Sequence, residues 1–142
     1  MRLQLYTGLD EVRFGMTRDQ VRAILGPPHK ISVDQEGDDS TEAWYYKDPE
    51  LSAHFDSDCD WRLSTLDSSE ASLELDGKRL IGKTEAELRT ACNSISWQWN
   101  GDEFEPLHVD EWALNFWIED GVLQSIQWWV PVDGNDRERW PE

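Results

Sequence analysis

The chain has 142 residues, of which 30 are Asp or Glu and 13 are Lys or Arg, so its formal net charge is −17 at pH 7. This length favours one domain, or two small halves around a shared core. The negative charge argues against nucleic acid and anionic membranes as partners, because both are themselves negatively charged. Nine Trp, four Phe and three Tyr exclude the acidic disordered class, which is poor in aromatic residues.

The cysteines and the hydropathy pattern point to no metal centre and no membrane segment. Cys59 and Cys92 lie far apart and have no zinc or redox spacing. The first residues lack the long apolar core of a signal peptide, and no stretch approaches the roughly 18 apolar residues of a membrane span. The sequence therefore predicts a cytoplasmic protein without a cofactor or a bound metal.

The first clear element in chain order is a short helix within residues 15–26. Thr17 is a favourable N-cap, and Gln20 three positions later completes a capping box. Gly26, followed by two prolines, ends the helix. Its apolar stripe consists of Val21, Ile24 and Leu25.

After this helix the hydrophobic period changes from 3.6 residues to 2, which indicates strands. Strands are predicted at 43–46, 51–55 and 61–66, with turns at 47–50 and 57–60. The polar segment 33–41, rich in Asp, Glu, Gly and Ser, is expected to be a mobile loop.

The pattern then recurs, which predicts an internal repeat. Residues 82–93 align without a gap on residues 15–26, and both segments begin Gly-x-Thr. Downstream, two strands at 112–118 and 122–130 form a hairpin that matches 51–66. Such repetition predicts two copies of one supersecondary unit, each burying its apolar face with help from the other.

The expected organisation follows from this repeat. The fold class is α+β, with two tandem units that each pack a short helical element on an antiparallel β-sheet. The chain is a single domain, 1–142, with repeat 1 at about 9–67, repeat 2 at about 72–131 and a short acidic tail at 132–142.

The string Gly-Met-Thr-x-x-Gln-Val-x-x-x-Leu-Gly-x-Pro at 15–28, followed by an aromatic strand and a Phe-bearing strand, resembles the β-lactamase-inhibitor-protein-like superfamily. Small outer-membrane-assembly lipoproteins are similar to it too. The resemblance covers residues 14–66 well and the second half more loosely. It implies tandem helix-plus-sheet units whose open sheet face binds proteins.

Two motifs could carry chemistry. Gly77–Thr84 satisfies the phosphate-binding loop pattern, but too few residues follow it to build the parallel sheet of a nucleotide hydrolase, so nucleotide binding is only a remote alternative. Asp56–Asp60 places carboxylates at positions 1, 3 and 5 of a calcium loop, but Trp61 replaces the glycine that such a loop requires. We interpret this second motif as an acidic hairpin turn.

No catalytic constellation is present, so the protein is predicted not to be an enzyme. His29, His54 and His108 show no metal or dyad spacing, and no nucleophile elbow occurs.

The aromatic residues suggest a binding surface. Strand alternation places Trp117 and Trp129 on the face opposite the apolar residues of their strands. These indoles either seal a core or form an aromatic patch of the kind that dominates protein interfaces. The predicted partner-binding residues are Trp117, Trp129, Trp99, Tyr45, Tyr46, His54, Asp56, Asp58 and Glu119.

The sequence hypothesis for function is an acidic, protein-binding inhibitor. Its concrete form is an immunity protein that occludes the active site of a basic toxin or hydrolase, since opposite charges steer association. The alternative is a non-enzymatic structural or assembly module that binds a constitutive protein partner. The sequence leaves the partner and the oligomeric state open.

Overall fold

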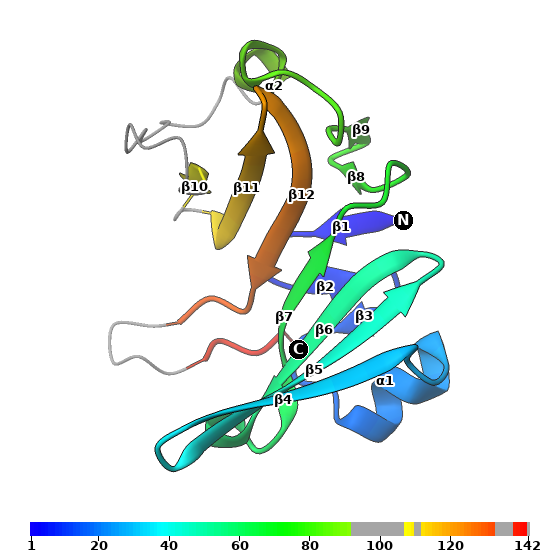
Figure 1. Cartoon of the computed structure of the whole chain (residues 1–142), viewed down its shortest axis with the longest axis vertical. Helices are drawn as coiled ribbons and strands as arrows, with labels where there is room; N and C mark the ends of the chain where they lie inside the picture. Colours follow the sequence, from blue (N-terminus) through cyan, green and yellow to red (C-terminus); the bar gives the residue numbers. More distant parts are fainter. Residues whose placement is uncertain (92–106, 110–111, 133–137, 142) are drawn as a thin grey trace.

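The computed structural model describes residues 1–91, 107–109, 112–132 and 138–141. These residues form an α+β fold of two helices and two sheets, in which most strand pairs are antiparallel. This confirms the fold class expected from the sequence. A large, twisted sheet runs through the molecule, and both helices and the small sheet lie to one side of it (Figure 1).

The large sheet has seven strands in the order β10-β11-β12-β7-β6-β5-β4. Hairpins connect β4 to β7 in chain order, and a second meander contributes β10 to β12. The two series meet where β7 pairs with β12. The strands are β4 (Lys30–Glu36), β5 (Asp39–Lys47), β6 (Glu50–Asp56), β7 (Arg62–Ser68), β10 (Leu107–Val109), β11 (Leu114–Glu119) and β12 (Val122–Trp129).

The small sheet was not foreseen from the sequence, apart from a plausible strand near residues 72–75. Its five short strands run in the order β3-β2-β1-β8-β9, and β1 and β8 form the parallel pair. It joins the N-terminus to the segment before the second helix. The strands are β1 (Arg2–Gln4), β2 (Gly8–Leu9), β3 (Val12–Arg13), β8 (Glu74–Leu75) and β9 (Lys78–Arg79).

Helix α1 (Arg18–Leu25) has the predicted ends. The Thr17 side chain accepts a hydrogen bond from the Gln20 N–H, and the Gln20 side-chain oxygen accepts one from the Thr17 N–H. Gly26, with φ of 83°, ends the helix, where glycine carries no steric penalty. Val21 is fully buried, but Ile24 is exposed, so the stripe that contacts the core is narrower than predicted.

Helix α2 (Glu85–Ala91) begins in the same way as α1. Thr84 and Glu87 exchange the two hydrogen bonds of a capping box, at 3.1 and 3.2 Å. Leu88 is fully buried at the position equivalent to Val21. The rest of the segment predicted as helix, from residue 92, lies outside the described residues.

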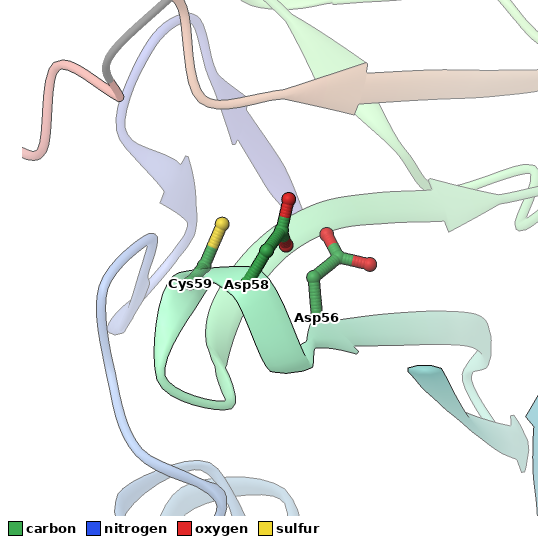
Figure 2. Close-up of side chains that lie close together, drawn as sticks. All are labelled: Asp56, Asp58 and Cys59. Carbon is green, nitrogen blue, oxygen red and sulfur yellow. The ribbon is translucent and has the colours of Figure 1, made fainter. Parts of the chain in front are cut away.

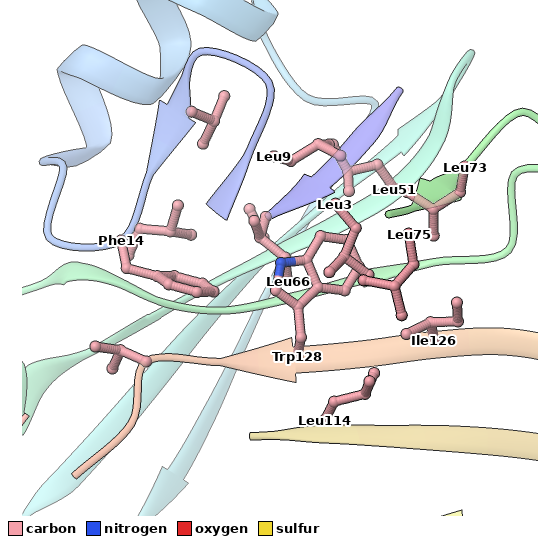
Figure 3. Packing of buried hydrophobic residues seen from close by; sticks show 14 of the residues in the cluster. Leu3, Leu9, Phe14, Leu51, Leu66, Leu73, Leu75, Leu114, Ile126 and Trp128 are labelled. Carbon is pink, nitrogen blue, oxygen red and sulfur yellow. The ribbon is translucent and has the colours of Figure 1, made fainter. Parts of the chain in front are cut away.

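The hydrophobic core fills the space between the large sheet and the helices with the small sheet. One row of inward side chains crosses five strands of the large sheet: Trp44, Ala53, Leu66, Trp128 and Leu114. Trp128 is fully buried, and its indole N–H donates to the Gly8 carbonyl at 2.9 Å (Figure 3). The core therefore joins the two ends of the chain.

Segment 33–41 is a hairpin, so the prediction of a mobile loop is wrong. β4 and β5 pair at seven positions from Lys30 with Tyr45 to Glu36 with Asp39. Gly37, with φ of 61°, stands at the first central position of the two-residue turn. β4 is an edge strand whose side chains are mostly exposed, so it lacks the apolar alternation that identifies strands in a sequence.

The two halves repeat the same hydrogen bonds. The Gly15 N–H donates to the Leu63 carbonyl and the Gly82 N–H to the Leu123 carbonyl, both at 2.9 Å. The return bonds, from the N–H of each leucine to the residue after each glycine, are 2.9 and 2.8 Å long. These matches support the proposed repeats at about 9–67 and 72–131.

A β-bulge also recurs at equivalent places. One residue, Ser64, is inserted in β7 opposite the His54–Phe55 step, and Gln124 is inserted in β12 opposite Trp117–Ile118. The bulge reverses the alternation beyond it. Leu123 therefore lies in the core, at 1% exposure, although strict alternation places it beside Trp129.

Candidate functional site

The face of the large sheet opposite the helices is the candidate site, and we call it the open face. Its outward side chains follow from the strand register. One row consists of Tyr45, Ser52, Asp67, Gln127 and Asn115, and a neighbouring row of Ala43, His54, Thr65 and Trp129. Neither helix contributes to these rows, and the open face carries polar as well as aromatic side chains, whereas the opposite face is apolar and buried.

Aromatic rings occupy separate parts of the open face. Trp117 on β11 is 39% exposed and Tyr45 on β5 is 38% exposed. Trp129 is half-buried and lies four residues along β12 from Ser125, the residue opposite Trp117. The strands thus present Trp117 and Tyr45 to solvent as large rings, which favours the interface interpretation over a sealed core for these two residues.

Asp67 lies near the middle of the open face, between Ser52 and Gln127 on the neighbouring strands. Desolvation by burial raises the pKa of its carboxyl group to about 6. No hydrogen bond or ion pair offsets this burial within the described residues. The carboxyl group forms part of a shallow pocket of about 520 Å³, which Tyr45 and Ser52 also line.

His54 stands in the adjacent row. Burial lowers the pKa of its imidazole, while the carboxylates of Asp56 and Asp34 oppose the shift. The ring is therefore neutral at pH 7 and presents one donor and one acceptor nitrogen. It is suited to hydrogen bonding with a partner rather than to holding charge.

The structure does not place all of the predicted binding residues in these two rows. Tyr46 points to the opposite face and donates its hydroxyl hydrogen to the Gly26 carbonyl at 2.9 Å, because neighbouring residues on a strand alternate. Asp58 is exposed in the β6–β7 turn, and Glu119 is exposed at the end of β11. Trp99 lies outside the described residues.

The acidic turn after β6 holds itself together through side chains. Asp56 accepts hydrogen bonds from Thr41, at 2.7 Å, and from Ser64, at 2.5 Å. Ligand atoms of Asp56, Asp58 and Cys59 lie within 4.8 Å of one another, and the three side chains extend from one short turn (Figure 2).

The cluster of Asp56, Asp58 and Cys59 has the properties of an acidic turn and is poorly suited to hold a metal ion. The Cys59 thiol donates to Glu138 at 3.0 Å. Burial, together with the Glu138 and Asp58 carboxylates, raises the pKa of the thiol, so the thiol stays protonated. A protonated thiol is a poor metal ligand. The turn itself is the 3₁₀ segment η1 (Ser57–Cys59), which ends in Asp60 and Trp61 at positive φ, and these observations agree with the acidic-turn interpretation.

The phosphate-loop motif is not a phosphate loop in three dimensions. Asp76 and Gly77, both at positive φ, form the two-residue turn between β8 and β9. The first three residues of the motif, 77–79, therefore belong to a hairpin and not to one continuous cradle. Lys83 and Thr84 immediately precede α2, as their counterparts Met16 and Thr17 precede α1.

Sequence reasoning missed the most unusual group on this face, Asp67. The available signal was an acidic residue inside the strand 62–68, at a position where alternation places it in the middle of a sheet. Its neighbours Gln127 and Asn115, joined by a 3.3 Å hydrogen bond, were likewise not singled out.

The fold is thus an α+β module with one covered and one open sheet face. Residues 6–50 match the family described as outer membrane protein assembly factor BamE domain. The match runs from the turn after β1 through α1 and β5 to the first residue of β6. Comparisons with curated proteins and with solved structures give no match.

This match corrects two of the sequence hypotheses. An immunity protein that inhibits a toxin is contradicted by the match to an assembly factor, and the cytoplasmic location by a family whose work concerns the outer membrane. The family is one of assembly factors rather than catalysts, which confirms that the chain is not an enzyme. None of the described helices is long and apolar enough to cross a membrane.

The sequence resemblance is confirmed in part. The N-terminal region matches the domain of an outer-membrane-assembly protein, as the string at 15–28 indicated. A protein as partner agrees with an assembly role. The toxin-directed form of that partner has no support.

Proposed function

We propose that the chain is a non-catalytic assembly module that acts at the outer membrane and binds a protein through its open face. The observation that carries the proposal is the family match over residues 6–50. That region supplies α1 and the hairpin β4–β5, which together set the covered face and one side of the open face.

The second half of the chain supplies the exposed indole. Trp117 lies on β11, beyond the matched region, and Trp129 lies on β12 beside Thr65 of β7. Because β7 and β12 are paired, both halves contribute to one continuous face. We therefore expect a partner to contact both halves.

The chemistry of the open face favours a cationic partner surface. The chain carries a net charge of −17, and the open face adds the unpaired carboxyl group of Asp67. A Lys or Arg side chain placed beside Asp67 would restore the lost interaction of that carboxylate and hold its pKa lower. Opposite fields would in addition speed the encounter.

The test is a complementation experiment in the organism that encodes the chain. Deleting the gene should lower the amount of folded outer membrane proteins, and the wild-type gene should restore it. The double variant Trp117→Ala with Trp129→Ala should fail to restore it, because an interface indole commonly contributes about 2 kcal/mol of binding energy. Circular dichroism and protein level check that this variant is folded.

The matched control is Arg79→Ala in β9, an exposed side chain on the small sheet. It should complement like the wild type. If deletion leaves the outer membrane proteins unchanged, the assembly function is wrong. If deletion has the effect but the folded double variant complements fully, the assembly function stands and the assignment of the open face is wrong.

A further inference from the structure

The strand β4 forms one edge of the large sheet. It pairs with β5 along all seven of its residues, and no other described strand pairs with it. Ile31 and Val33 are 45% and 60% exposed, and Val33 is the most exposed of the large hydrophobic residues described. A regular strand edge with exposed apolar side chains is a template for pairing with another strand.

The side chains of β4 divide cleanly between the two faces. Ile31 lies opposite Trp44 and lines a groove of about 440 Å³ beside α1, so Ile31 and Val33 belong to the helix side. Lys30, Ser32 and Asp34 alternate with them and belong to the open face.

This order of residues is self-complementary. In an antiparallel pair of two β4 strands with Ser32 opposite itself, Ile31 of each copy lies opposite Val33 of the other. On the other face, Lys30 of each copy lies opposite Asp34 of the other. A twofold axis through Ser32 repeats both contacts, as an isologous interface requires.

We propose that β4 is a self-association edge at which two copies of the chain pair antiparallel about Ser32. The pairing joins the two seven-stranded sheets into one and covers Ile31 and Val33 in both copies. The open faces of the two copies then lie on the same side of the joined sheet, so the dimer presents two partner-binding faces together.

The register is specified by the side chains. Slipping by one residue sets Ile31 against Asp34 and places apolar and charged groups on the same face. Slipping by two, to an axis at Val33, pairs Val33 with itself and Lys30 with Glu36, but it sets Ile31 opposite the polar Gln35. Only the axis at Ser32 sets both Ile31 and Val33 against apolar residues of the other copy and also keeps an opposite-charge pair.

The net charge of −17 opposes self-association. At about 0.15 M salt this repulsion is screened beyond roughly 8 Å, whereas the contacts across the paired strands are shorter. The dimer should therefore be weak and should appear with rising concentration.

Sedimentation velocity on the full chain in about 0.15 M NaCl, from about 5 to about 500 μM, tests the proposal. The wild type should shift from monomer to dimer over this range. Lys30→Asp and Asp34→Lys, each placing like charges opposite one another twice, should weaken association about tenfold. The double variant Lys30→Asp with Asp34→Lys restores the pairing and should recover association to within about threefold of the wild type.

The matched control exchanges the charges of Lys47 and Glu50, which face each other between β5 and β6 and lie outside β4. Lys47→Asp with Glu50→Lys should leave association unchanged. A wild type that remains monomeric to the top concentration overturns the proposal. The proposal is also overturned if the single β4 variants associate as strongly as the wild type, or if the double variant fails to restore association.

Discussion

The position of Asp67 in the middle of the sheet changes the pKa of its carboxyl group. The side chain is largely buried on the open face, so its charged form loses hydration without gaining a cation from the described residues. Its folded pKa of about 6 lies above the unfolded value, and the folded state therefore binds more protons than the unfolded state between about pH 4 and 6. The favourable contribution of the protonated form is lost as pH rises through about 6.

We expect Asp67→Asn to stabilise the protein at neutral pH, because the amide keeps the size of the side chain and removes the buried charge. The gain over the wild type should grow by about 2 kcal/mol between pH 4.5 and 7.5. Urea unfolding at several pH values measures it. A gain that is the same at every pH would show that Asp67 is ionised normally.

His54 changes stability with pH in the opposite direction. Its folded pKa is lowered by burial, so its contribution is present above the unfolded pKa and is lost as pH falls. Because both groups titrate in overlapping ranges, the wild-type profile is flattened. His54→Gln isolates the Asp67 slope and serves as the control for that prediction.

Strand alternation predicted some residue positions and failed at others for a local reason. It placed Leu114, Phe116, Ile126 and Trp128 in the core, where the structure has them. It placed Leu123 on the wrong face, because a bulge adds a residue between Leu123 and Ile126. A sequence does not mark a bulge, since the inserted residue is an ordinary polar one.

At the scale of elements, success followed the strength of local signals. α1 could be predicted because its N-cap, its buried apolar position and its terminating glycine occur in order, at Thr17, Val21 and Gly26. β4 could not be predicted from the sequence, because an exposed edge strand needs no alternation of apolar and polar residues. The small sheet could not be predicted either, because its two- and three-residue strands are held by partners distant in the chain, as β1 is by β8.

The two capping boxes should contribute similar stability at neutral pH. Thr17→Ala and Thr84→Ala each remove a hydroxyl that accepts the N–H of the third helical residue, and each should lower the free energy of unfolding by about 1 kcal/mol. Thr→Ser at the same positions keeps the acceptor and should have a smaller effect. Urea denaturation measures all four variants.

Acid should distinguish the two boxes. Hydrogen bonds from the Thr84 backbone N–H and, next in size, from the Thr84 side chain lower the pKa of Glu87, and Thr84→Ala removes the second of them. The stabilising carboxylate is present above its unfolded pKa and is lost as pH falls. Gln20, the equivalent residue at α1, does not titrate. The cost of Thr84→Ala should therefore shrink toward pH 3 to 4, whereas the cost of Thr17→Ala stays constant. Equal losses in acid would contradict a role for the Glu87 charge.

At the scale of the whole molecule, the two halves are related by an approximate twofold axis through the β7–β12 ladder. Leu63 and Leu123 receive equivalent hydrogen bonds from Gly15 and Gly82, so residues of β7 correspond to residues sixty positions later in β12. Leu66 pairs with Trp128 and Ser68 pairs with Ile126. Replacing each residue by its equivalent interchanges these two pairs, as a twofold relation requires.

This relation was visible in the sequence only through the helices. The twelve-residue match at 15–26 and 82–93 indicated the repeat, but the way the halves join depends on long-range pairing. The family match covers residues 6–50 only, so the second half adds an indole-bearing hairpin to the matched region. The proposed assembly function thus rests on the first half of the chain, whereas the exposed indole of Trp117 lies in the second half.

The shared sheet and core predict that the halves unfold together. The Trp128 indole, from the second half, is fully buried and donates to Gly8 in the N-terminal sheet at 2.9 Å. Trp128→Phe leaves that carbonyl without its donor and a small cavity beside it, so it should lower the free energy of unfolding by about 2–3 kcal/mol. Trp117→Phe, at an exposed position, should cost less than about 1 kcal/mol.

Urea unfolding of both variants and the wild type, followed by far-ultraviolet circular dichroism and by tryptophan fluorescence, should give coincident single transitions, because neither half has a complete core alone. Two separated transitions in the wild type, or a Trp128→Phe effect confined to one of them, would show that the halves are independent domains.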